Sequence, residues 1–151
     1  MKFLANFMVV ILFLFITGMP VGAAVLPEEM ELQKAWISAQ FRGETANVPF
    51  SFRYSGQASG NLLPKWQVTK TMVKLDENRQ KYLQSYTDPQ TGLEVRCEEI
   101  EYLDFPTAEW VVYLKNIGGQ DTPILEDIEA LDLQLTRPAD TEFVLQYHTG
   151  G

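Results

Sequence analysis

Short stretches in which apolar and polar residues alternate, with turn-forming residues between them, constrain the fold of this chain most strongly. These stretches lie at 50–54, 66–72, 82–86, 93–102 and 110–114, and two further strands are expected at about 124–135 and 142–148. Successive side chains of a strand point to opposite faces of a sheet, so a period of two is typical of half-buried strands. The pattern predicts a mainly β fold, an antiparallel β-sandwich preceded by one short helix.

The residues between these stretches favour turns. In the segment 88–92, Pro89 presets its φ for the second position of a turn, and Gly92 can take a positive φ before the next strand. Similar groups are Ser55-Gly56, Asp76-Glu77-Asn78, Asn116-Ile117-Gly118-Gly119 and Arg137-Pro138-Ala139-Asp140. Frequent turns of this kind agree with short, antiparallel strands.

Two of the expected strands have unusual patterns. In 93–102 the apolar phase slips at Glu98-Glu99, which predicts a β-bulge. In 110–114 both faces are rather apolar, which predicts a central strand. Cys97 is the only cysteine and lies in the first of these runs, so we expect a buried, inert thiol that forms no internal disulfide.

One helix is expected at about 26–40. Pro27 suits the first helical turn, and Glu28 and Glu29 are favoured beside the positive end of the helix dipole. Apolar residues recur at helical spacing and predict one buried stripe, formed by Leu32, Ala35, Trp36 and Ala39. Gly43 can end the helix.

The first residues have the parts of a secretory signal peptide: a basic start at Lys2, an apolar run at 3–16 and small residues at Ala23 and Ala24, after either of which cleavage fits. The alternative is an uncleaved membrane anchor, but the apolar run is shorter than the roughly 20 residues that span a bilayer. We therefore expect a periplasmic or secreted bacterial protein. Its expected parts are a signal peptide at 1–23, a short helix and linker at 24–47 and a β-sandwich at 48–151, truncated at its C-terminal end.

Charge limits the partners of the exported chain. Removal of the signal leaves 11 basic and 20 acidic side chains, a net charge near −9 over about 127 residues. Such a surface repels phosphate backbones, so nucleic acid and, after signal cleavage, anionic membranes are poor partners. About 127 residues can form one domain with a real core.

Acidic residues are the first candidates for catalysis. They gather in two expected strands, as Glu98, Glu99 and Glu101 and as Glu126, Asp127, Glu129 and Asp132. A glycosidase needs two carboxyl groups roughly 5 to 9.5 Å apart across a sugar, whereas acidic residues on a strand usually form its solvated face, which is the interpretation we favour. His148 is the single histidine, and Asp76-Glu77-Asn78 lacks the order of a calcium loop. We expect no catalytic residue, no metal site and no cofactor.

The tryptophans are candidates for stacking on a sugar ring. Trp36 lies on the expected helical stripe and Trp110 in the expected central strand, so both are expected in the core. Trp66 follows Leu62-Leu63-Pro64-Lys65 at the edge of a loop and is the candidate for contact with a ligand. An aldose-epimerase-like activity, which typically uses histidine with glutamate, fits poorly with one histidine near the end of the chain.

An ordered series of motifs resembles bacterial α-galactosidases of the melibiase group. The series comprises Pro49-Phe50-Ser51-Phe52, Tyr54, Gly56, Ser59, Leu62-Leu63-Pro64, Trp66, Thr87-Asp88-Pro89, Thr91 to Cys97, Asp104-Phe105-Pro106, Glu109-Trp110, Lys115-Asn116, Asp121 to Leu125 and Ala130-Leu131-Asp132. The resemblance covers about 49–148. The pair Ser55-Gly56 stands where the family pattern suggests two glycines.

The resemblance implies a large N-terminal, supersandwich-like β-sandwich that packs on a (β/α)₈ barrel, the missing partner of this chain. In that family two aspartates of the barrel cleave terminal α-galactosides with retention, and neither can be assigned here. Trp66 would lie in a segment that reaches the rim of the active site. The chain alone would then be an inactive, non-catalytic front part of an exported glycoside hydrolase.

Two alternatives remain open at this stage. The chain can be a stand-alone, secreted carbohydrate-binding β-sandwich, whose partner is a galactoside or another sugar. It can also be a non-functional fragment whose exposed sheet edge would invite aggregation.

Overall fold

A computed structural model describes residues 25–43, 47–134 and 142. The elements in chain order are α1 (Pro27–Phe41), β1 (Ser51–Tyr54), β2 (Gln57–Ala58), α2 (Ser59–Leu62), the 3-10 helix η1 (Leu63–Lys65), β3 (Gln67–Lys74), β4 (Arg79–Thr87), β5 (Leu93–Tyr102), β6 (Ala108–Asn116) and β7 (Leu125–Glu129). The expected signal peptide with Ala23 and Ala24, the turn at 137–140 and the strand at 142–148 lie outside this part or almost entirely so.

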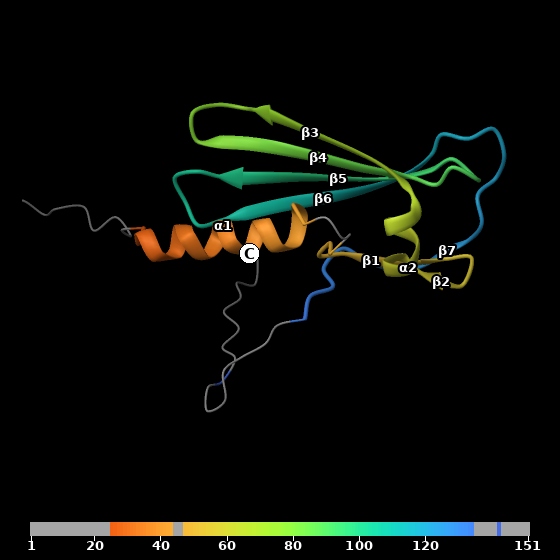
Figure 1. Ribbon diagram of the computed structural model, residues 1–151, viewed down its shortest axis with the longest axis horizontal. Helices are drawn as coiled ribbons and strands as arrows, with labels where there is room; N and C mark the ends of the chain where they lie inside the picture. The colour runs from red at the N-terminus through yellow and green to blue at the C-terminus, as the bar shows by residue number, and fades with distance from the viewer. Residues whose placement is uncertain (1–24, 44–46, 135–141, 143–151) are drawn as a thin grey trace, which may run out of the picture.

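The described strands form two antiparallel sheets. The larger sheet is a meander in the order β3-β4-β5-β6, and the smaller has the order β2-β1-β7. In Figure 1, α1 runs alongside one end of the larger sheet. The small sheet lies near the opposite end of the larger sheet. The prediction of a mainly β, antiparallel fold with two sheets and one short leading helix is confirmed.

Local chemistry sets the ends of α1. Pro27 occupies the first turn, and the side chain of Glu29 accepts a hydrogen bond of 3.1 Å from the backbone of Leu26. The helix ends at Phe41, and the backbone N–H of Arg42 donates to the carbonyl of Ser38. Its bounds are therefore one residue later than expected at each end.

Of the apolar stripe predicted for α1, Trp36 packs against the core but the other three members do not. Leu32 is 70% exposed, and Ala35 and Ala39 are exposed as well. The helix instead buries Gln33, Ile37 and Phe41, which also recur at helical spacing. The helix is therefore rotated about its axis relative to the prediction. This orientation packs Ile37 and Phe41 against the sheet and lets the amide of Gln33 bind backbone carbonyls, as described below.

The core lies between α1, the small sheet and the inner face of the large sheet. Its buried apolar members are Ile37, Phe41, Phe50, Phe52, Tyr54, Leu63, Trp66, Tyr86, Leu93, Val95 and Cys97. Cys97 is 2% exposed and forms no disulfide, which confirms the expected buried thiol. Burial raises its pKa to about 12, with Glu99 and Glu98 adding to the shift, so the thiol stays protonated and unreactive.

Two predictions about individual strands are corrected. The ladders of β5 with both neighbours run without a register shift, so there is no bulge at Glu98-Glu99. The residues from Leu93 to Glu101 alternate instead in one phase, with every second residue buried. The strand β6 is an edge among the described strands, not a central strand, and β7 is shorter than expected.

The hairpin between β4 and β5 has the expected turn chemistry. Gly92 has a φ of +78°, and the backbone of Gly118 would lie only 2.6 Å from a Cβ atom at this position. The N–H of Gly92 donates to the carbonyl of Asp88. Both the positive φ and the close approach of a second turn therefore require glycine here.

Candidate ligand groove beside Arg42

The end of α1 borders a groove of about 310 Å³ over the inner face of the large sheet. We call it the Arg42 groove. It is lined by Phe41 and Arg42 at the end of α1, Lys70, Thr71 and Met72 of β3, Tyr82, Leu83 and Gln84 of β4, and Cys97 and Glu99 of β5. Its volume lies at the lower end of the range for small-molecule sites.

The groove exists because α1 covers only part of the sheet. Residues of α1 contact the β5–β6 side, where the ring of Trp36 lies 5.8 Å from that of Trp110. On the other side every residue of β3 is exposed. Strand register aligns Met72 with Tyr82 and Tyr82 with Glu99, so these three side chains share the inner face. The open half of the sheet is thus an apolar surface with polar groups at its inner border.

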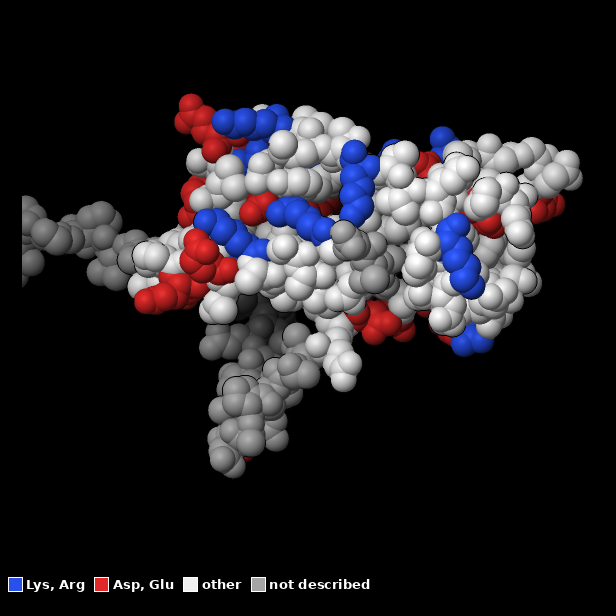
Figure 2. All heavy atoms as spheres, viewed as in Figure 1, with Lys and Arg blue, Asp and Glu red and all other residues white. Residues whose placement is uncertain are grey.

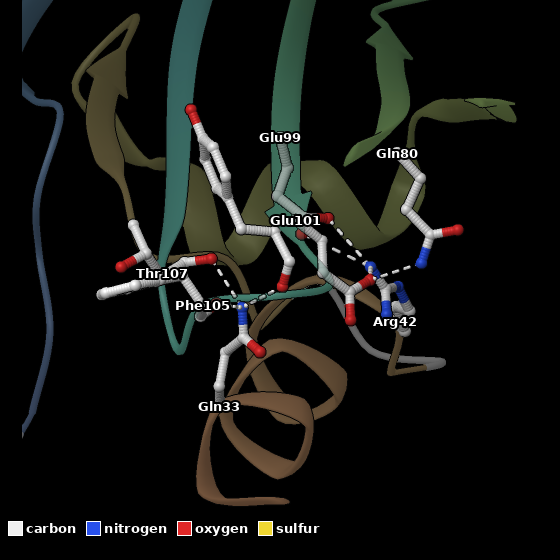
Figure 3. A network of polar contacts seen from close by, with 8 residues as sticks. Gln33, Arg42, Gln80, Glu99, Glu101, Phe105 and Thr107 are labelled. Atoms are coloured by element: carbon white, nitrogen blue, oxygen red, sulfur yellow. Dashed lines mark hydrogen bonds and ion pairs between the residues drawn. The ribbon is translucent and has the colours of Figure 1, made fainter. Parts of the chain in front are cut away.

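Arg42 links the helix to two buried carboxylates of β5. Its Nη2 donates to Glu99 Oε2 at 3.2 Å and to Glu101 Oε2 at 3.0 Å, as Figure 3 shows. Gln80 Nε2 donates to the same Glu101 oxygen at 2.9 Å. The guanidinium carbon lies 3.7 Å from the ring centroid of Tyr82, a cation–π contact. The position of Arg42 is therefore fixed by both charge and stacking.

Sequence reasoning missed this network. Glu99 and Glu101 are 1% and 4% exposed, so their assignment to a solvated face is wrong. The signal was present in the phase of β5, because Leu93, Val95 and Cys97 alternate in step with the two glutamates. Glu98 of β5 does lie on the outer, solvent-facing side of the sheet, where it pairs with Lys81 and Arg96.

Burial changes the pKa of one carboxyl group that lines the groove, that of Glu99. It raises the pKa of Glu99 to about 7, with Arg42 opposing the shift and Glu101 adding to it. Glu99 can therefore hold a proton near neutral pH. Figure 2 shows basic and acidic side chains interspersed on the visible face rather than gathered into one patch.

A second polar contact holds α1 in place. Gln33 Nε2 lies 2.5–3.2 Å from three carbonyl oxygens, those of Tyr102 at the end of β5 and of Phe105 and Thr107 in the turn before β6 (Figure 3). Gln33 is 7% exposed, so these contacts replace water. They anchor the middle of α1 and so help to position Arg42, two and a half turns further along, over the open half of the sheet.

Trp66, the residue predicted for ligand contact, is 8% exposed. Its ring lies 6.2 Å from that of Phe52 and 5.9 Å from that of Tyr54. It also lines a separate depression of about 360 Å³ with Asp88 and Gln57. Contact between Trp66 and a ligand stays a prediction. Because the ring is nearly buried against Phe52 and Tyr54, Trp66 also contributes to the core.

The other predicted residues are dispersed. Trp36 and Trp110 are partly buried against the core, as expected. Asp127 and Glu129 lie on β7, at the edge of the small sheet, and are exposed. Within 25–43, 47–134 and 142, no group of three or more His, Cys, Asp or Glu side chains could hold a metal ion. His148 lies outside the described residues.

Comparisons with known proteins find no match for this chain, either among protein-family models, among curated proteins or among solved structures. None of the described helices is long and apolar enough to cross a membrane.

Proposed function

We propose that this domain is a non-catalytic carbohydrate-binding module whose sugar occupies the Arg42 groove. The observation that carries the proposal is the combination, in one open groove, of an apolar wall and fixed polar side chains. The two faces of a pyranose differ in the same way, since C–H groups on one face pack on apolar surface while hydroxyl groups need hydrogen bonds.

The apolar wall is accessible. Met72 is 55% exposed, and its strand neighbour Tyr82 borders the groove on the next strand. A ligand that covers these side chains gains the free energy of apolar burial, roughly 25 cal/mol for each Å² removed from water.

The polar groups are held in place before a ligand arrives. Arg42 is fixed by Glu99, Glu101 and Tyr82 as described above, and its Nε is buried without a partner. Gln84, whose amide nitrogen donates to the hydroxyl of Tyr86, and Lys70 line the groove from the neighbouring strands. Groups that are already ordered lose little conformational entropy on binding, which favours affinity.

The carboxylates support binding rather than hydrolysis. A glycosidase needs one carboxyl group to protonate the leaving oxygen and a second on the other side of the scissile bond. Glu99 and Glu101 are almost fully buried, and both accept from the same nitrogen of Arg42. They therefore approach one guanidinium from the same strand and cannot enclose a sugar ring.

Calorimetric titration of the purified chain with α-galactosides and with other mono- and disaccharides tests the proposal. We expect micromolar to millimolar affinity for at least one sugar, which Met72→Ala and Gln84→Ala weaken about tenfold each. Val73→Ala, on the outer face of β3, is the matched control and should leave the affinity unchanged. Absence of binding to the whole panel, or binding abolished by Trp66→Phe but not by Met72→Ala, would contradict the groove assignment.

The second candidate function is the front domain of an exported α-galactosidase, supported by the ordered motif series from Pro49 to Asp132 and by the two antiparallel sheets. Its partner would be a catalytic barrel, and terminal α-galactosides would be hydrolysed there. The DNA that follows the codon of Gly151 tests this candidate. An in-frame or frameshifted barrel with two acidic residues at strand ends favours it, whereas unrelated sequence after a genuine stop favours the module.

A further inference from the structure

The outer edge of β6 is the least protected edge of the large sheet. No other described strand pairs with it. Its inner face carries Trp110, Val112 and Leu114, and on its outer face Val111 and Tyr113 are 52% and 43% exposed. A strand that is apolar on both faces and unpaired along one edge is a template for another strand.

The opposite edge of the sheet is protected. Strand register places Lys70 and Lys74 of β3 on the inner face, opposite Gln84 and Gln80. Inward-pointing lysines on an edge strand discourage pairing with further strands. Antiparallel pairing of two β3 strands about Met72 would also bring Lys70 of one copy opposite Lys74 of the other, which is unfavourable.

The sequence of β6, in contrast, is complementary to itself. If two β6 strands pair antiparallel about Val112, Glu109 of each copy stands opposite Lys115 of the other, and Val111 stands opposite Tyr113. Residues directly opposite in such a pair share a face, so both ion pairs form on the outer face. On the inner face the same register places Trp110 opposite Leu114.

We propose that β6 is a homodimer interface, and that the partner of this edge is the β6 strand of a second copy of this chain. The two four-stranded sheets then form one continuous antiparallel sheet about a two-fold axis perpendicular to it. This axis keeps both inner faces on the same side, as the register about Val112 requires.

A second groove lies beside the start of β6. It has a volume of about 710 Å³ and is lined mainly by apolar residues of α1 and β6, among them Leu32, Trp36, Ala108 and Trp110. Leu32 is 70% exposed. The register about Val112 places Ala108, which lines this groove, opposite Asn116 of the second copy, so the groove borders the end of the partner's β6 strand.

Sedimentation velocity of the purified chain, from about 1 to 500 µM, tests the proposal. We expect a reversible monomer–dimer equilibrium, as small interfaces give, that Glu109→Lys or Lys115→Glu each weakens about tenfold, because either change opposes like charges twice. The double variant Glu109→Lys/Lys115→Glu should restore the dimer. Glu77→Lys, in the β3–β4 turn, is the matched control and should leave the equilibrium unchanged.

Three results would overturn the proposal. The first is a monomer over the whole concentration range. The second is a dimer that neither single charge reversal weakens. The third is a monomer in which removal of residues 142–148 speeds hydrogen exchange of β6 amides, because the chain's own C-terminal segment would then occupy the edge.

Discussion

The two halves of the large sheet have the same strand geometry and opposite surroundings. On the β5–β6 side, α1 covers the inner face through Ile37, Phe41 and the amide of Gln33. On the β3–β4 side the inner face is open and forms the Arg42 groove. The two edge strands also differ, because β3 has lysines on its inner face whereas β6 has apolar side chains there. A meander of four strands thus separates the proposed ligand groove from the proposed dimer edge.

Arg42 lies at the border between these halves. It is the residue after α1, and it reaches buried carboxylates of β5 while it stacks on Tyr82 of β4. The covered half therefore supplies the two carboxyl groups, Glu99 and Glu101, that hold Arg42 at the border of the groove. Substitutions in one half at a time test this division of the sheet.

The largest effect is expected from Ile37→Ala on the covered half. Ile37 is 0% exposed, and its truncation leaves a cavity between α1 and the sheet, which lowers the free energy of unfolding by about 3–4 kcal/mol. Met72→Ala on the open half should lower it by less than about 0.5 kcal/mol. Urea denaturation followed by circular dichroism measures both, and equal losses would contradict the division into a covered and an open half.

Arg42→Ala should lower the free energy of unfolding by about 3 kcal/mol, because it leaves two buried carboxyl groups without their cation. We expect a value at the low end of the range for buried pairs, since the side chain of Arg42 is 29% exposed. Arg42→Lys keeps the charge but not the planar guanidinium that stacks on Tyr82, and it should recover part of the loss. Denaturation of the three proteins in parallel checks the order, and full stability of Arg42→Ala would refute the network's role.

Stability should also depend on pH through Glu99. Burial raises its pKa from 4.5 to about 7, so between these values the folded chain binds a proton that the unfolded chain has lost. The stabilisation is fully present below pH 4.5 and is lost as the pH rises to about 7. The expected loss is about 3 kcal/mol, since a difference of one in pKa corresponds to about 1.4 kcal/mol. Glu99→Gln should flatten this slope relative to the unmodified chain, and an unchanged slope in urea titrations at several pH values would contradict the assignment.

The smallest effect on stability is expected from Lys70→Thr/Lys74→Thr on the β3 edge. Both positions are exposed, so the free energy of unfolding should change by no more than about 0.5 kcal/mol. Loss of the inward lysines should nevertheless let β3 pair with other strands, and sedimentation should detect species larger than a dimer. If the double variant associates no more than the unmodified chain, the lysines do not protect this edge.

Much of the fold follows from local sequence signals. Pro27 and the glutamates after it mark the start of α1, and Gly92 marks the β4–β5 turn, because these residues act on their own backbone. The mainly β class follows from alternation. The rotation of α1 does not follow, since two stripes share its helical spacing and only the sheet determines which of them is buried.

The candidate site was harder to predict for a related reason. The burial of Glu99 and Glu101 depends on Arg42, which is 57 and 59 residues away in the chain. Glutamate is rarely buried unless a partner is present, and a pattern read along one strand does not include the partner. The edge position of β6 was missed because apolar residues on both faces are typical of a central strand.

Hydrogen exchange of the edge amides, measured at low and high protein concentration and with and without bound sugar, tests the division of the sheet most directly. We predict that raising the protein concentration slows exchange in β6 and leaves β3 unchanged, whereas sugar slows exchange at the groove residues of β3 and β4 at either concentration. Slower exchange of β3 with rising concentration, or rates in β6 that are independent of concentration, would contradict the account.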